Sequence, residues 1–294
     1  MVTPFASDGA IDWPGVDTLV THLLTSGSHG LVVCGTTGES PALSHSEKVA
    51  MFRRVAGCAK GKPVIAGTGT NNTAESIELS REAVDAGVDG LLLVVPPYNK
   101  PSQAGMYSHF AAIAQSVPHT PCILYNVPSR TAQNLTADTT LRLARDVPNI
   151  VAIKEASGNL MQISEIAAGA PTAFAIYSGD DGMTLPILSI GGVGVVSVTA
   201  HLAGVETAEM VQAWFERDAA RATRIHHSLL PLVQACFQPS TPSPVPLKAG
   251  LRMMGLPGGG VRPPLVQATP DEAAVMAAAL TARGSAMARE SAVL

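Results

Sequence analysis

Seven short apolar runs recur between residues 31 and 215 of the sequence, and a stretch with helical periodicity separates each run from the next. A short continuous apolar run is typical of a strand that is buried on both faces. Strands that alternate with helices predict a parallel sheet wound with helices. The runs are Leu31 to Cys34, Val64 to Gly67, Leu91 to Val95, Cys122 to Tyr125, Ile150 to Ile153, Phe174 to Tyr177 and Val193 to Val198. The helical patterns lie near 14–26, 44–60, 73–86, 102–117, 136–147, 159–168, 181–190 and 202–215.

This repeat favours a (β/α)8 TIM barrel, which needs an eighth strand in addition to the seven clear ones. The only place for the eighth strand is Met1 to Phe5, so we expect a first strand that is truncated at the N-terminus, or a true start that lies upstream. A doubly wound open sheet would carry a glycine-rich turn after its first strand, but Thr3-Pro4-Phe5 stands there. Three pairs of glycines are each expected to end a helix just before a strand: Gly27 and Gly30, Gly87 and Gly90, and Gly191 and Gly194.

After residue 215 the strand pattern stops. Helical patterns near 216–237, 246–254 and 270–283 predict an all-α extension, and the proline-rich segment Gln238 to Pro246 interrupts it. We therefore expect residues 1–215 to form the barrel and residues 216–294 to form a C-terminal helical extension packed on it.

The composition restricts the class of protein. Hydrophobic residues make up 46% of the chain and charged residues only 14%, so little charge is left to cover a surface, and we expect a heavily buried, oligomeric protein. A net charge of −4 argues against nucleic acid as a partner. No apolar stretch has the length of a membrane span, and no signal peptide is recognisable. The four scattered cysteines indicate reduced thiols and a cytoplasmic protein.

Lys154 directly follows the apolar run Ile150 to Ile153. Burial disfavours an ammonium and lowers its pKa, which leaves a free amine that can attack a ketone and form a Schiff base. A lysine at a strand end also commonly extends to solvent and pairs with a carboxylate such as Glu155, and for a lone lysine this is the usual arrangement. The neighbouring strand ends decide between the two interpretations.

Three further polar segments follow predicted strands, at the barrel rim where such folds carry their active sites. Gly35 to Ser40 offers backbone N–H groups and hydroxyls to a carboxylate, Pro96 to Pro101 presents a phenol, and Tyr125 to Thr131 presents a second phenol and a guanidinium. Each segment alone is explained by a turn, a capping tyrosine or a solvated arginine. Together with Lys154 at one rim, they favour an enzyme.

Three motifs carry a family resemblance: Gly35-Thr36-Thr37-Gly38-Glu39-Ser40, Tyr125-Asn126-Val127-Pro128-Ser129-Arg130-Thr131 and Ile153-Lys154-Glu155-Ala156. In this order and spacing they resemble the dihydrodipicolinate synthase family of the class I pyruvate-dependent aldolase-like (N-acetylneuraminate lyase) superfamily. The resemblance extends over nearly the whole chain.

The resemblance implies a lyase of lysine (diaminopimelate) biosynthesis. It would condense pyruvate with aspartate semialdehyde to 4-hydroxy-tetrahydrodipicolinate through a Schiff base on Lys154. Thr36, Tyr98 and Tyr125 would form a proton relay, with Tyr125 closest to the imine, and Tyr98 would reach into a neighbouring subunit's site. The implied assembly is a homotetramer, a dimer of dimers.

The resemblance also implies the substrate contacts. Thr37 and the amides of its loop would hold the pyruvate carboxylate, and Arg130 would grip the carboxylate of the semialdehyde with a bidentate pair. Gly179 and Val196 match positions that line the pyruvate pocket. No cofactor and no metal are expected, because a chain of hydroxyls moves protons without a metal and the eight histidines lack ligand spacing.

Two alternatives remain open. One is another pyruvate-forming Schiff-base aldolase, such as a sialic acid or 2-keto-3-deoxy sugar acid lyase. Arg130 disfavours it, because a guanidinium suits a small second carboxylate better than a polyol. The other is a non-catalytic ligand-binding barrel. Such a protein has no chemical need for the set Lys154, Tyr125, Thr36, Tyr98 and Arg130.

The allosteric lysine site of many relatives is only partly matched. Where lysine-sensitive relatives carry a histidine this chain has Lys48, and where they carry a tyrosine it has Pro97. A cation at that place repels a lysine effector, so we expect weak or absent feedback inhibition. The aligned lysine-contacting positions are Ser40, His45, Asn71 and Glu75.

Overall fold

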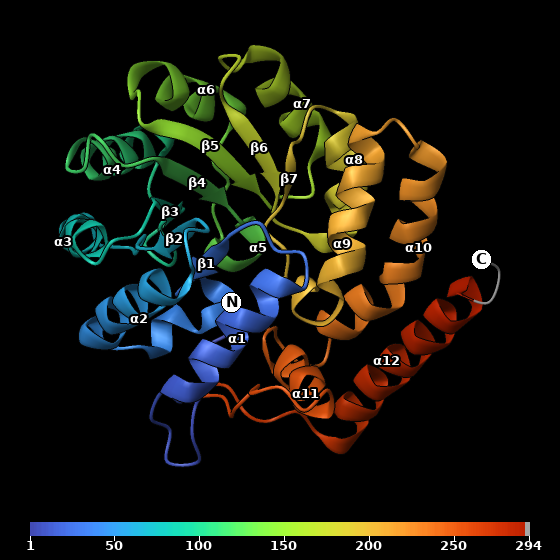
Figure 1. Cartoon of the computed structure of the whole chain (residues 1–294). Helices are drawn as coiled ribbons and strands as arrows, with labels where there is room; N and C mark the ends of the chain where they lie inside the picture. The colour runs from blue at the N-terminus through green and yellow to red at the C-terminus, as the bar shows by residue number, and fades with distance from the viewer. Residues whose placement is uncertain (292–294) are drawn as a thin grey trace. The chain divides into compact units, whose positions relative to one another are not determined.

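The computed structural model describes residues 1–291, and it contains the predicted seven-stranded sheet. The strands lie side by side in chain order, and neighbours from β2 to β7 run parallel. Figure 1 shows this sheet with helices between successive strands. The strands are β1 (Leu31–Val33), β2 (Val64–Gly67), β3 (Gly90–Val94), β4 (Cys122–Asn126), β5 (Ile150–Glu155), β6 (Ala175–Ser178) and β7 (Gly194–Val195).

The helices also follow the predicted pattern, and the predicted fold class, a TIM-barrel-like α/β fold with C-terminal helices, is confirmed. The α-helices are α1 (Trp13–Thr25), α2 (His45–Cys58), α3 (Thr73–Asp85), α4 (Gln103–Gln115), α5 (Pro128–Thr131), α6 (Ala137–Asp146), α7 (Leu160–Gly169), α8 (Thr184–Ser189), α9 (Ala200–Phe215), α10 (Ala219–Cys236), α11 (Val245–Met253) and α12 (Pro270–Ser291). Three short 3-10 helices are η1 (Thr36–Gly38), η2 (Ser40–Ala42) and η3 (Asp181–Met183).

The prediction that glycines end helices just before strands is confirmed. Gly27, Gly87 and Gly191 have φ values of 100°, 89° and 106°, each just past a helix and shortly before a strand. Only glycine adopts this backbone conformation without strain, so these positions end α1, α3 and α8.

The truncated first strand that was predicted within Met1 to Phe5 is not part of the sheet. Among the described residues, none before Leu31 forms a strand of the sheet, although Val2 and Thr3 are fully buried. Pro4 has no N–H group to donate to a strand neighbour. The N–H of Val2 instead donates to Nε2 of His201 at 3.1 Å, and Phe5 makes an isolated antiparallel bridge with Ile11.

The chain divides into two compact units. One consists of Met1–Leu31, Thr36–Leu43 and the residues from Val198 onward, and the other of Val32–Gly35 and Ser44–Ser197. The second unit contains nearly the whole sheet, with Lys154. The first contains helices α1 and α9 to α12 and the Thr36–Leu43 segment. The expected boundary between barrel and extension after residue 215 stays a prediction.

A buried charge cluster in the first unit, here called the Glu39 cluster, joins Glu39, Lys248, Arg262 and the ring of Phe5. Glu39 is 4% exposed and Lys248 is 0% exposed, and Nζ of Lys248 donates to Oε1 of Glu39. The backbone N–H of Arg262 donates to Oε2 of Glu39 at 3.0 Å. Nζ of Lys248 lies 4.5 Å and Cζ of Arg262 4.3 Å from the Phe5 ring centroid. Glu39, which has a left-handed φ of 56°, is thereby tied to residues more than 200 positions away.

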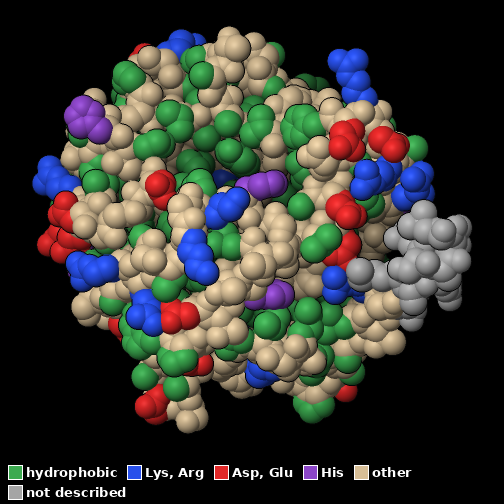
Figure 2. Space-filling view, viewed as in Figure 1, with side chains coloured by type: hydrophobic (Ala, Val, Ile, Leu, Met, Phe, Trp, Pro, Cys, Tyr) green, Lys and Arg blue, Asp and Glu red, His purple; other side chains and the backbone are tan. Residues whose placement is uncertain are grey.

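The surface and the thiols agree with the composition. On the face seen in Figure 2, acidic and basic side chains are interspersed and neither sign covers it. The four cysteines are unbridged, and all but the half-buried Cys58 are buried. In the described part of the chain, no helix has the length and apolar character needed to cross a membrane.

Candidate active site

Lys154 lies near the C-terminal end of β5, in the interior of the parallel sheet. It is paired in register with Tyr125 on β4 and with Tyr177 on β6, and it is 9% exposed. Its Nζ atom is 4.1 Å from the centroid of the Tyr125 ring. The buried strand Ile150–Glu155 therefore carries a lysine whose amine lies over a phenol at the sheet edge where barrel enzymes bind substrate.

The ionisation of Lys154 suits a nucleophile. Burial lowers the pKa of the Lys154 ammonium from 10.5 to about 8, while the negative charge of Asp181 acts to raise it and the positive charge of Arg130 lowers it further. A lower pKa means that more of the lysine is a free amine near neutral pH. The free amine is the form that attacks a carbonyl carbon.

Glu155 is not the partner of Lys154. Its carboxylate accepts hydrogen bonds from Asn126 Nδ2 at 3.0 Å, from Gln162 Nε2 at 3.2 Å and from the N–H of Ser157 at 3.2 Å. Successive side chains of a strand point to opposite faces, so Glu155 and Lys154 face opposite sides of the sheet. The interpretation of Lys154 as a lysine paired with Glu155 at a strand end is therefore wrong.

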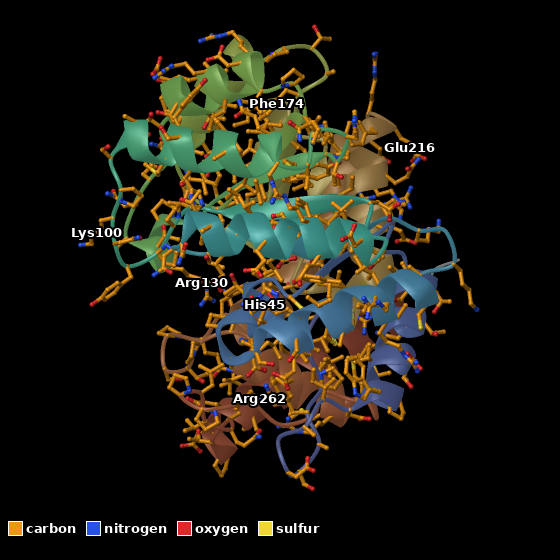
Figure 3. The ribbon with its side chains drawn as sticks, turned by 90° about the vertical axis from the view of Figure 1, so that its left-hand side faces the viewer. His45, Lys100, Arg130, Phe174, Glu216 and Arg262 are labelled. Atoms are coloured by element: carbon orange, nitrogen blue, oxygen red, sulfur yellow. The ribbon has the colours of Figure 1, made fainter. Side chains whose placement is uncertain are left out.

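Tyr125 and Arg130 come from the same strand end. Tyr125 is 6% exposed at the end of β4, and Arg130 is exposed on the short helix α5, which begins at Pro128 (Figure 3). Pro128 at the first helical position and Ala132, with a φ of 56°, delimit one helical turn. Arg130 contributes to the lowered pKa of Lys154, so its charge acts on the amine.

Gly179 and Val196 follow the next two strands at the same edge. A Cβ atom on Gly179 would lie 3.0 Å from Cε of Lys154 and 2.9 Å from Cβ of Ala156, so only glycine leaves room for the lysine stem. The half-buried Val196 follows β7, and its N–H donates to the carbonyl of Ser178 at 2.9 Å. The prediction that both residues contribute shape and backbone to a pyruvate pocket stays a prediction.

Gly179→Ala tests this close approach. The added methyl group displaces the Lys154 stem, and we expect kcat/KM to fall by about 10- to 100-fold, because small misplacements of reacting groups cost that much. Circular dichroism checks that the fold is kept, and steady-state kinetics measure the loss. Gly57→Ala on α2 is the matched control, because no atom lies within 4 Å of its added Cβ. Equal activity of the two variants would contradict the close approach.

Three of the predicted site residues have roles that the structure leaves untested. The ring of Tyr98 is 89% exposed on a backbone with φ of 72°, so it does not touch the buried amine of its own chain. Thr36 and Thr37 lie half-buried on the 3-10 helix η1, in the unit that does not contain Lys154. Their roles at the Schiff base stay predictions.

Asp181 and Ser197 had no predicted role, but the structure places both after strands at this edge of the sheet. Asp181 follows β6, is 6% exposed, and its Oδ1 accepts a hydrogen bond from Oγ of Ser197. Asp181 comes just after β6, which pairs with β5, and Ser197 comes just after β7, the next strand of the sheet. That position was the one signal in the sequence that could have identified them.

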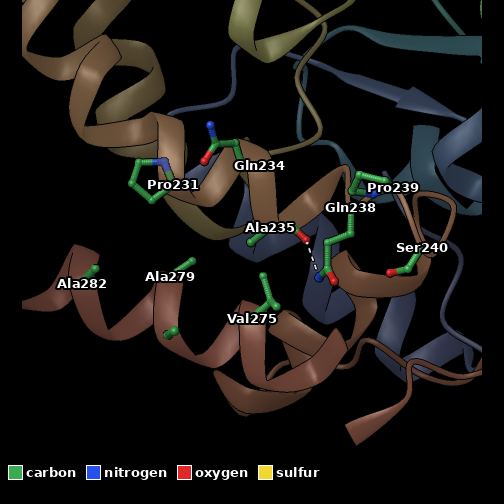
Figure 4. Close-up of a pocket in the computed structure, with 10 residues that line it drawn as sticks. Pro231, Gln234, Ala235, Gln238, Pro239, Ser240, Val275, Ala279 and Ala282 are labelled. Carbon is green, nitrogen blue, oxygen red and sulfur yellow. Dashed lines mark hydrogen bonds between the residues drawn. The ribbon is translucent and has the colours of Figure 1, made fainter. Parts of the chain in front are cut away.

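The described residues away from Lys154 offer fewer groups that could catalyse a reaction. Among them, no three His, Cys, Asp or Glu side chains cluster as metal ligands. A pocket of about 580 Å³ between α10 and α12 is lined by small apolar side chains, two glutamines and a serine, with no titratable group (Figure 4). It cannot supply acid–base catalysis, so Lys154 remains the candidate site.

A lysine with a lowered pKa, over a phenol at the C-terminal edge of a barrel-like parallel sheet, defines the class of Schiff-base-forming lyases. The dihydrodipicolinate synthetase family model matches residues 1–283, and the chain belongs to this family. A 4-hydroxy-tetrahydrodipicolinate synthase from Moorella thermoacetica is 54% identical over 97% of this chain and 96% of its own.

Two solved structures are similar over nearly their whole length. A dihydrodipicolinate synthase from Cyanidioschyzon merolae with lysine bound has a TM-score of 0.94 at 44% identity, covering 97% of this chain and 96% of its own. A monomeric dihydrodipicolinate synthase variant has a TM-score of 0.93 at 35% identity, covering 97% and 95%.

Proposed function

We propose that this protein condenses pyruvate with L-aspartate 4-semialdehyde to 4-hydroxy-tetrahydrodipicolinate, the product that the name of its relative from Moorella thermoacetica gives. The observation that carries the proposal is the buried amine of Lys154, with a pKa of about 8, over the ring of Tyr125. This arrangement supplies a nucleophile for the ketone and a phenol for proton transfer.

The chemistry follows in balanced steps. The free amine of Lys154 attacks the ketone carbon of pyruvate, and the carbinolamine takes up a proton and loses water to give an iminium. Loss of a methyl proton gives the enamine, whose carbon attacks the aldehyde carbon of the semialdehyde. The aldehyde oxygen takes up a proton and becomes the hydroxyl group of the product, and the Lys154 nitrogen becomes an iminium nitrogen again. The amino group of the semialdehyde then adds to the former ketone carbon, closes the ring and releases Lys154. Tyr125 moves protons in these steps, in a relay with Thr36 and the Tyr98 of a neighbouring subunit.

The substrate contacts follow from charge. Arg130 holds the carboxylate of the semialdehyde, since a guanidinium binds a carboxylate in a bidentate way. Thr37 and its loop amides hold the pyruvate carboxylate, and Gly179 and Val196 shape its pocket. A sugar acid or sialic acid lyase is the second candidate, and the exposed Arg130 disfavours it, because a polyol needs neutral donors and acceptors.

We propose a cytoplasmic homotetramer, built as a dimer of dimers. The 89% exposed ring of Tyr98 and its φ of 72° support this assembly, because strain and an exposed aromatic ring are found where a chain meets a partner. Nucleic acid is not expected as a partner of a chain with a net charge of −4.

The test is an assay of purified protein with pyruvate and aspartate semialdehyde, in parallel with pyruvate and N-acetylmannosamine or a sugar aldehyde. We expect turnover with the semialdehyde alone. Turnover with the sugar aldehydes alone would assign the sugar acid class, and a folded protein that turns over neither pair would support the non-catalytic barrel.

Inhibition by lysine is expected to be weak or absent. Lys48, where lysine-sensitive relatives carry a histidine, is 8% exposed on α2, and a buried cation disfavours a second cation beside it. Initial rates across a lysine titration measure the effect. Half-inhibition by submillimolar lysine would refute the expectation, and Lys48→His is the variant expected to increase sensitivity.

A further inference from the structure

The amide side chain of Asn126 lies at the end of β4 and is 0% exposed, but the proposed steps do not use it. Its Oδ1 accepts a hydrogen bond from the N–H of Leu135 at 3.0 Å. Its Nδ2 donates to Oδ1 of Asn134 at 2.8 Å, to Oε1 of Glu155 at 3.0 Å and, more weakly, to the carbonyl of Leu135 at 3.4 Å. A buried amide with partners on both its atoms is held in one orientation.

The contact with Leu135 closes a loop. The chain leaves the sheet after Asn126, forms the short helix α5 with Arg130, and returns at Leu135 to the Asn126 amide. Residues 127–134 are here called the α5 loop. Because one side chain binds both the N–H and the carbonyl of the residue that ends the loop, the two ends of the α5 loop are fixed at one point.

The contact with Glu155 ties the base of the α5 loop to the strand of Lys154. Asn126 on β4 and Glu155 on β5 are paired in register, and Glu155 directly follows Lys154. The Glu155 carboxylate is 0% exposed and also accepts from Nε2 of Gln162 at 3.2 Å. A buried polar network whose members all have partners holds one arrangement.

The strand ends themselves do not depend on the Asn126 side chain. The N–H of Ala156 donates to the carbonyl of Asn126 at 2.9 Å, and the N–H of Gly179 donates to the carbonyl of Glu155 at 2.7 Å. These backbone hydrogen bonds hold β4, β5 and β6 beside one another whatever side chain residue 126 carries. The Asn126 side chain therefore acts on the α5 loop more than on Lys154.

Two further hydrogen bonds attach the C-terminal part of the α5 loop to the segment at the start of α4. Nε2 of Gln103 donates to the carbonyl of Asn134 at 2.8 Å, and Nε2 of Gln133 donates to the carbonyl of Pro101 at 3.2 Å. These bonds persist without the Asn126 side chain. We therefore expect its loss to displace the α5 loop and not to unfold it.

We propose that Asn126 is a positioning residue for the second substrate, because its closure of the α5 loop sets where Arg130 meets the carboxylate of the semialdehyde. The proposal rests on the function proposed above, in which Arg130 holds that carboxylate. Successive side chains of a strand face opposite sides, so Asn126 faces away from the side of Tyr125 and Lys154 and touches no substrate itself. Its effect passes through the position of Arg130.

The physical reason is the geometry that a guanidinium needs. A bidentate pair with a carboxylate forms only when the two planar groups are aligned. The exposed Arg130 lies four positions after Asn126 on a helix of one turn, so a shift at the base of the α5 loop moves the guanidinium. The pyruvate imine forms on Lys154, which the backbone bonds of β5 keep in place. Loss of the Asn126 side chain therefore weakens the second substrate selectively.

Asn126→Ala tests the proposal, because alanine removes the side-chain bonds at the loop base and keeps the backbone. We expect KM for aspartate semialdehyde to rise by about 10- to 100-fold, the usual cost of a small misplacement. We expect KM for pyruvate and the rate of borohydride trapping with saturating pyruvate to stay within about threefold of wild type. In an Arg130→Ala background, the same substitution should change KM for the semialdehyde by less than about threefold, because the guanidinium through which it acts is gone.

Asn149→Ala is the matched control. Nδ2 of Asn149 also closes a loop by donating to backbone carbonyls, at 2.9 Å to Ala114, 3.1 Å to Val117 and 3.0 Å to Thr120. Asn149 precedes β5, at the opposite end of that strand from its catalytic lysine. We expect Asn149→Ala to lose stability and to leave both KM values unchanged.

A merely structural role of Asn126 would give the result expected for the control, a loss of stability with no difference between the two substrates. If Asn126→Ala does not fold, Asn134→Ala is the second variant. It removes one partner of the Asn126 amide at a half-buried position, and it should raise KM for the semialdehyde and not for pyruvate.

The outcomes separate the two proposals. If wild type turns over the semialdehyde and Asn126→Ala keeps the wild-type ratio of the two KM values, the role of Asn126 is refuted while the proposed function stands. An undiminished effect of Asn126→Ala in the Arg130→Ala background would refute it too. If wild type does not turn over the semialdehyde, the proposed function fails, and the inference about Asn126 fails with it.

Discussion

Replacing Lys154 by methionine is expected to lower kcat/KM by a factor of at least about 10⁴, because the variant has no amine to form the Schiff base. Methionine has an unbranched chain of similar length, so it fills the space between the Tyr125 ring and the backbone of Gly179. We expect the fold to be unchanged or slightly more stable, since a buried titratable group with a lowered pKa is replaced by an apolar one.

Kinetics with pyruvate and aspartate semialdehyde measure the loss, and denaturant unfolding measures stability. Lys62→Met is the matched control, because Lys62 is exposed and lies before β2, and we expect full activity from it. Turnover by Lys154→Met within about tenfold of wild type would mean that the reaction does not pass through this lysine.

The second large effect concerns stability and the Glu39 cluster. Glu39→Ala is expected to lower the free energy of unfolding by about 3–5 kcal/mol, the usual result of removing one partner of a buried ion pair. Lys248 is 0% exposed. In the variant it would keep its hydrogen bond to the carbonyl of Gly260 and its contact with the ring of Phe5, but it would lose the negative charge of Glu39. Burial already lowers the pKa of Lys248 to about 8 even with Glu39 in place.

Two controls make this result specific. Glu216→Ala breaks an ion pair with Arg221 whose side chains are 49% and 39% exposed, and it should cost no more than about 1 kcal/mol. The double variant Glu39→Leu with Lys248→Met removes both charges and should recover much of the loss. Equal costs for Glu39→Ala and Glu216→Ala would show that the buried pair does not stabilise the fold in the way described.

Most of the sheet could be predicted from the sequence because buried parallel strands are apolar over their whole length. The run Val64 to Gly67 coincides with β2, and the other strands begin within two residues of the predicted positions. The same local pattern placed Lys154 at the end of a buried strand. The apolar run of a buried strand and the periodicity of a helix involve residues that are close together in the chain. Both patterns can therefore be recognised in a single sequence.

Most of the missed features depend on residues that are far apart in the chain. The pairing of Phe5 with Ile11 and the bond between Val2 and His201 replace a strand that the barrel repeat had predicted. The pair of Glu39 and Lys248 spans 209 positions. Asp181 received no role in the sequence analysis, because its effect on Lys154 depends on how β5 and β6 are aligned. Contacts of this kind form only when the strands and helices pack together, so no short stretch of the sequence predicts them.

The most direct test of the Schiff-base assignment is the intact mass of the wild-type protein after sodium borohydride reduction in the presence of pyruvate, followed by peptide mapping. We expect a mass increase equal to one reduced pyruvate imine, located on the peptide that contains Lys154, with no adduct on Lys154→Met. No adduct on the folded wild-type protein, or an adduct on another lysine, would contradict the assignment of Lys154 as the reacting amine.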